Sequence, residues 1–151
     1  MKTEFFDFEA DFVDNLRCIP MIVRFKLDTC GVKLKLTHWN NLTTEERQLL
    51  VSLPCDNTDE AIAYKNRLQD LIVQKTSTPA GEIAINPNPP WLDADTIPPE
   101  VRAKASEFAV TISTTQWQNL TPLQRFALIK LSRPSHENSN FYPALVEFNL
   151  T

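Results

Sequence analysis

Trp39-Asn40-Asn41-Leu42-Thr43 recurs 78 positions later as Trp117-Gln118-Asn119-Leu120-Thr121. The match extends on both sides of this pattern: residues 19–53 align with residues 97–131 without a gap, and 14 of the 35 aligned positions are identical. A unit this short cannot bury its apolar face alone, so we expect the two copies to pack about a pseudo-twofold axis. The repeat therefore predicts an internally duplicated domain.

Each copy of the pattern ends in a threonine that can begin a helix. Thr43 is followed by Glu46, and Thr121 by Gln124, which is the spacing of a capping box, in which side chain and backbone satisfy each other's hydrogen bonds. We therefore expect helices after both threonines, the first over residues 44–53. A further helix is predicted from about residue 59 to residue 74, because its apolar residues fall on one face.

Where the secondary structure of one copy is ambiguous, the aligned residues of the other copy indicate it. Residues 23–27 alternate like a strand, but the aligned residues 100–105 are rich in helix formers and follow two prolines, so both are predicted to be helical. Residues 32–36 and 110–114 alternate in both copies. We expect them to be short extended pieces that could pair with each other as a two-stranded ribbon.

The copies are joined by a proline-rich connector, residues 76–99. It holds six of the eleven prolines, so it should be irregular but stiff, with Trp91 as the residue that pins it to the core. A chain of 151 residues can bury one core. The sequence thus predicts a single, mainly α-helical domain over residues 1–151.

Composition excludes several classes of function. A net charge of -4 and a pI near 5.2, with scattered basic residues, argue against binding to nucleic acid or to an anionic membrane. Only two residues are glycine, which argues against phosphate-binding loops. We find no signal peptide or transmembrane run, and three widely spaced cysteines fit reduced thiols, so we expect a cytoplasmic protein.

The candidate catalytic and metal-binding residues are weak. His38 aligns with Gln116, so we interpret it as a polar residue at a helix start. Cys18, Cys30 and Cys55 lack the paired short spacings of a zinc site and are predicted to be small buried residues. Cys18, next to Arg17 and a helix start, is left open as a reactive thiol. We expect no metal, no cofactor and no enzymatic activity.

Two further groups of residues each have two interpretations. The matched arginine pairs, Arg24 with Arg102 and Arg47 with Arg125, are either cations that bind a ligand or partners of carboxylates and helix ends, the second being commoner. The polar stretch of residues 133–140 either recognises a partner or terminates the preceding helix. The candidate partner-binding residues are Arg17, Cys18, Arg133, His136, Glu137, Asn138 and Asn140.

Several strings resemble one known family. Residues 11–13, 16–21 and 23–31, and then residues 123–128, 130–134 and 136–138, are similar to the nitrate reductase-associated proteins of cyanobacteria. The resemblance covers nearly the whole chain except the connector. It implies an accessory protein that supports a cytoplasmic molybdenum nitrate reductase and that is encoded near nitrate-assimilation and molybdopterin genes, and it implies no catalytic residues.

Two functions follow as hypotheses. In the first, the protein binds the nitrate reductase polypeptide and assists its maturation. In the second, it binds a small anion or a molybdopterin-type cofactor as a carrier, because arginine forks suit phosphate groups.

Overall fold

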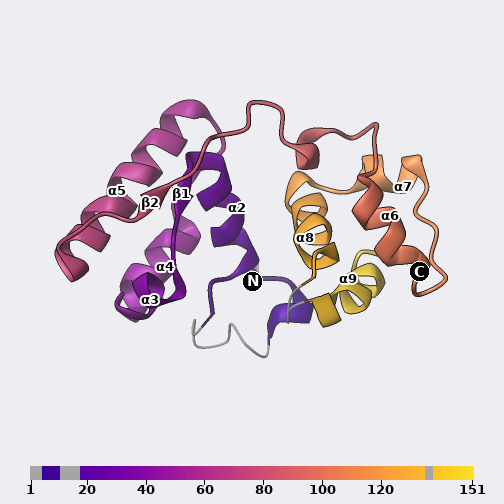
Figure 1. Cartoon of the computed structure of the whole chain (residues 1–151), viewed down its shortest axis with the longest axis horizontal. Helices are drawn as coiled ribbons and strands as arrows, with labels where there is room; N and C mark the ends of the chain where they lie inside the picture. Colours follow the sequence, from indigo (N-terminus) through magenta and orange to yellow (C-terminus); the bar gives the residue numbers. More distant parts are fainter. Residues whose placement is uncertain (1–4, 11–17, 135–137) are drawn as a thin grey trace. The chain divides into compact units, whose positions relative to one another are not determined.

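The computed structural model describes residues 5–10, 18–134 and 138–151 (Figure 1). These residues form eight α-helices, three short 3-10 helices and one two-stranded antiparallel ribbon, so the mainly helical class is confirmed. The chain divides into two compact units, residues 1–86 and 87–151. The single domain over residues 1–151 stays a prediction.

Unit 1 packs three long helices around one core. Its elements are η1 (Asp7–Glu9), α2 (Met21–Cys30), β1 (Val32–Lys33), α3 (Leu36–Asn40), α4 (Thr44–Ser52), α5 (Thr58–Thr76) and β2 (Gly81–Glu82). The predicted apolar face of α5 is confirmed, because Tyr64, Leu68, Leu71 and Ile72 are all buried. They meet buried residues of α2 and α4 in a single hydrophobic cluster.

Unit 2 is built around α8. Its elements are η2 (Pro90–Leu92), α6 (Pro99–Ser106), α7 (Thr114–Asn119), α8 (Pro122–Ser132), η3 (Asn138–Asn140) and α9 (Phe141–Glu147). Every residue of α8 from Arg125 to Leu131, except Lys130, is buried. Trp91 of the connector is also buried, and its ring packs edge-to-face with that of Phe126, with 5.0 Å between the ring centres. This confirms that Trp91 attaches the connector to the core.

Both predicted capping boxes are present. The Thr43 hydroxyl accepts a hydrogen bond from the backbone N–H of Glu46, whose carboxylate accepts one from the N–H of Thr43 at 2.8 Å. Thr121 and Gln124 repeat the arrangement at the start of α8. Local side-chain chemistry therefore begins α4 and α8 at the predicted residues.

The predicted pairing of the two extended segments is wrong. Residues 110–113 form no strand, and β1 pairs antiparallel with β2, with Val32 opposite Glu82 and Lys33 opposite Gly81. Each segment is cut short by a further helix that the alternation concealed. In unit 2 that helix begins because the Ser113 hydroxyl accepts from the N–H of Gln116, a third capping box.

Matched positions adopt the same local structure in both units. Trp39 and Trp117 are both fully buried. Gly31 and its counterpart Ala109 both take a left-handed backbone conformation, with φ of 79° and 57°. A duplicated unit would show these recurrences; the duplication and its pseudo-twofold axis stay predictions.

Candidate functional site

The candidate partner-binding residues fall in two places. Cys18 is half-buried, three positions before α2 begins, and Arg17 lies outside the described residues. In unit 2, Arg133 is exposed at the C-terminal end of α8, and Asn140 stands directly before α9. His136 and Glu137 lie outside the described residues, and Asn138 begins η3. The first place therefore belongs to unit 1 and the second to unit 2.

An exposed apolar patch in unit 2 adjoins this second place. Tyr142 and Val146 lie one turn apart on α9, and Phe108 follows the end of α6 with its ring 5.1 Å from that of Tyr142. The exposed fractions of Phe108, Tyr142 and Val146 are 39%, 42% and 48%. We call these three residues the α6–α9 patch. Aromatic residues in such exposed clusters are typical of protein-binding surfaces.

Charged side chains border the patch. The ammonium group of Lys104 lies 5.8 Å from the ring centre of Phe108 and 3.2 Å from the carboxylate of Glu107. On its inner side the Phe108 ring stacks on the fully buried Phe141, with 6.4 Å between centres. The patch is therefore supported by the core of unit 2 while one of its faces is open to solvent.

The sequence interpretation missed this patch. Tyr142 and Val146 have the spacing of an ordinary core-facing helix pair. The available signal was the repeat, because Phe108 aligns with Cys30, and Cys30 is buried. A large aromatic residue that replaces a small buried one at a matched position indicates a change of role.

One of the two matched arginine pairs, Arg47 with Arg125, binds main-chain carbonyls. Arg47 Nε donates to the carbonyl of Trp39 at 3.1 Å, and Arg125 Nε donates to that of Trp117 at 3.0 Å. Arg125 makes three more such bonds, to the carbonyls of Trp91, Gln118 and Leu120. Burial lowers the pKa of the Arg125 guanidinium. These contacts confirm the interpretation of Arg47 and Arg125 as partners of helix ends.

His38 has the structural role predicted for it. Its Nδ1 accepts a hydrogen bond from the backbone N–H of Lys35 at 3.1 Å, as the amide oxygen of Gln116 accepts from Ser113 at 2.9 Å. The histidine therefore replaces an amide at a helix start.

Buried polar groups in unit 1 close the end of α4. Lys26 donates from Nζ to the carbonyls of Val51 and Leu53, each at 2.6 Å, and the Tyr64 hydroxyl donates to that of Leu50 at 2.7 Å. These carbonyls have no partner within the helix, so the two side chains complete its last turn.

Two cysteines lie in the same core as small buried residues, as predicted. The Cys30 and Cys55 thiols donate weakly to the carbonyls of Leu27 and Lys26. Burial raises the pKa of Cys30 to about 12 and that of Cys55 to about 11. Because only the thiolate is an effective nucleophile, both thiols are unreactive in the folded unit at neutral pH.

The described residues hold no group of three or more His, Cys, Asp or Glu side chains that could bind a metal ion. In the same part of the chain, no helix is both long and apolar enough to cross a membrane.

Comparison with known proteins decides the family. The sequence profile of the conserved nitrate reductase-associated proteins matches residues 5–148. The chain belongs to this family. The match includes the connector, which the resemblance of individual strings did not cover. No curated protein and no solved structure matches the chain. The family's description indicates an association with nitrate reductase, and the α6–α9 patch lies within the matched residues.

Proposed function

We propose that this protein is a non-catalytic accessory factor that binds the nitrate reductase polypeptide in the cytoplasm and assists maturation of that molybdoenzyme. The observation that carries the proposal is the family match, which extends over residues 5–148 and names the associated enzyme. In this proposal the chain contributes a docking surface, while the chemistry belongs to the reductase.

The surface we assign to this contact is the α6–α9 patch together with the polar stretch that precedes α9. Arg133 follows α8, and Asn140 directly precedes α9, the helix that carries Tyr142 and Val146. An apolar centre with a polar rim is the usual organisation of a protein interface. Arg17, Cys18, His136, Glu137 and Asn138 stay candidate contacts.

Co-purification tests the proposal directly. Tagged protein should recover the reductase from cells grown on nitrate, and recovery of the cofactor-free form would place the contact before cofactor insertion. Deletion of the gene should lower either the amount of reductase or its molybdenum content. The proposal fails if neither form is recovered and deletion leaves reductase activity intact.

Surface variants test the assigned patch. Replacing Tyr142 and Val146 together by serine should lower recovery of the reductase about tenfold or more, since aromatic anchors dominate interface energies. The matched control is Ile62→Ser with Val73→Ser, which changes two exposed apolar residues of α5 in unit 1. Equal recovery with both variants would remove the patch from the proposal.

The alternative, a carrier of a small anion or molybdopterin-type cofactor, gains no support from the matched pair Arg47 and Arg125. Arg47 and Arg125 donate to carbonyls rather than facing a ligand. Titration with molybdate, nitrate and a pterin nucleotide should leave the melting temperature unchanged, and an upward shift would favour the carrier.

A further inference from the structure

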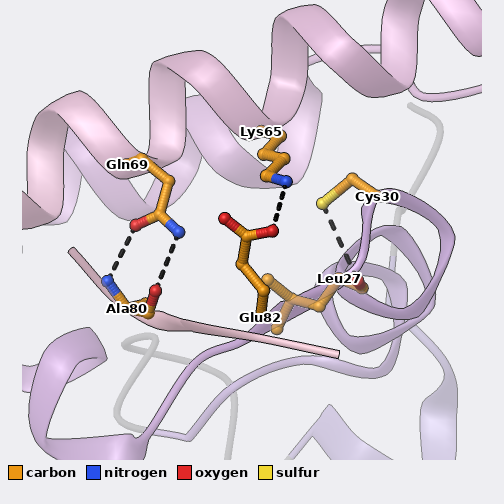
Figure 2. A network of polar contacts seen from close by, with 6 residues as sticks. All are labelled: Leu27, Cys30, Lys65, Gln69, Ala80 and Glu82. Carbon is orange, nitrogen blue, oxygen red and sulfur yellow. Dashed lines mark hydrogen bonds and ion pairs between the residues drawn. The ribbon is translucent and has the colours of Figure 1, made fainter. Parts of the chain in front are cut away.

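The connector leaves α5 and crosses unit 1 as an extended strap, residues 80–85, with β2 alongside β1 (Figure 1). One side-chain amide holds its start. The N–H of Ala80 donates to Gln69 Oε1 at 2.8 Å, and Gln69 Nε2 donates back to the carbonyl of Ala80 at 3.0 Å (Figure 2). The glutamine thus pairs with the strap as a neighbouring strand would.

In addition to the pairing of β2 with β1, two contacts hold the middle of the strap. The N–H of Ile83 donates to the carbonyl of Gly31 at 2.9 Å. The ammonium group of Lys65 lies 2.9 Å from the carboxylate of Glu82, in a pair that is open to solvent (Figure 2). Hydrogen bonds and ion pairs exposed to water each contribute little net free energy, because water competes for the same groups.

The strap fits closely but, apart from the buried Ala80, covers little apolar surface. A Cβ atom at Gly31 would lie 2.8 Å from both the carbonyl oxygen of Ile83 and Cγ1 of Ile85, so glycine permits the approach. Yet the exposed fractions of Ile83 and Ile85 are 39% and 56%. The helix beneath differs, because Leu68 and Ile72 of α5 are fully buried.

From this contrast we propose that the strap is a releasable latch, which opens as a unit while the helices of unit 1 stay folded. Segments with few buried apolar contacts and solvent-exposed hydrogen bonds open at a lower free energy than the core that they cover. The Gln69 amide is the clasp of this latch, because it makes both hydrogen bonds to Ala80.

A buried thiol reports on the latch. Cys30 directly precedes Gly31, to which the strap is bound, and its side chain is buried. Figure 2 shows it on the same side of α5 as Lys65 and Glu82. We expect opening of the strap to expose Cys30, because the strap binds the next residue, Gly31; Cys55 lies in the loop between α4 and α5, which none of these strap contacts involves.

Site-resolved alkylation of the full chain tests this proposal. Gln69→Ala should raise the alkylation rate of Cys30 by about tenfold or more, because two hydrogen bonds are lost, and should leave the rate of Cys55 nearly unchanged. Gln74→Ala, an exposed glutamine on the same helix, is the matched control. The proposal is overturned if Gln69→Ala raises the alkylation rates of both thiols by the same factor, or raises neither.

Native-state hydrogen exchange gives a second test that needs no variant. The amides of Ala80 and Ile83 should exchange faster than those of Leu68 and Ile72, at a rate that low concentrations of denaturant do not change. Exchange of all four amides with one shared, denaturant-dependent free energy would show that the strap opens only on global unfolding, and would overturn the proposal.

Discussion

The guanidinium group of Arg125 donates from Nη1 to the main-chain carbonyl of Trp91 at 3.0 Å, across 34 positions of sequence. This bond fixes the end of the connector to α8. Arg125 donates to four carbonyls in all and is buried, whereas its counterpart Arg47 is half-buried and donates to the carbonyls of Trp39 and Asn40.

This difference predicts unequal costs for the two arginines. Arg125→Met should lower the free energy of unfolding by about 3 kcal/mol, because buried carbonyls lose a charged donor. Arg47→Met should cost about 1 kcal/mol, since water can replace the donor there. Urea denaturation of the full chain measures both, and equal costs would contradict the assigned role of Arg125.

The capping boxes that begin α4 and α8 predict different responses to acid, because Glu46 titrates and Gln124 does not. The pKa of Glu46 is lowered chiefly by the hydrogen bond from the Thr43 backbone, and to a smaller extent by contacts with Lys75. The stability that this carboxylate contributes is present above its unfolded pKa, near 4.5, and is lost as pH falls through the lower folded value.

Glu46→Gln should therefore reduce the loss of stability between about pH 5 and pH 3, and Gln124→Glu should increase it. Denaturation midpoints across this range are the measurement. The glutamine that unit 2 carries at the matched position makes the comparison internal to one chain. The same dependence of the denaturation midpoint on pH in both variants and in the parent protein would contradict this prediction.

The buried thiols predict a loss of stability in alkali. Their pKa values, about 12 for Cys30 and about 11 for Cys55, are raised above the ordinary value of 9.0. The contribution of a raised pKa is fully present below pH 9 and is lost as pH rises toward the folded values. Cys30→Ala with Cys55→Ala should therefore flatten the decline in unfolding free energy above pH 9, and a decline of unchanged slope would count against it.

The two glycines predict contrasting effects of one methyl group. Gly31→Ala should cost about 2 kcal/mol or more, because φ is +79° and the new Cβ would press on the strap. Gly81→Ala meets nothing closer than the Lys33 Cβ at 3.9 Å and should be nearly neutral. Thermal denaturation distinguishes them, and similar costs would show that the contact at Gly31 is unimportant.

Features that depend on a few neighbouring residues could be predicted from the sequence. Thr43 with Glu46, and Thr121 with Gln124, specify their helix starts because the hydrogen bonds join residues three apart. The partner of β1 could not be predicted. Val32 pairs with Glu82 across 50 positions, and nothing in the sequence of the connector distinguishes Gly81 and Glu82 as a strand.

The candidate surface was predictable only in part. The polar residues Arg133 and Asn140 stood out because polar stretches after a helix often bind partners. Tyr142 and Val146 did not, since an apolar pair at helical spacing normally faces a core. Whether such a pair is covered depends on which distant element packs across it, and that information is not local.

The clasp at Gln69 also determines where the tether between the two units begins. With the strap docked, the connecting chain runs from Ile85 to the anchored Trp91; with the strap released it runs from Ala80, and each freed residue adds up to about 3.5 Å of reach. For a partner that engages both units at once, reach sets the effective concentration of the second unit after the first has bound. For such a partner, a single glutamine side chain would thereby tune avidity without touching the α6–α9 patch.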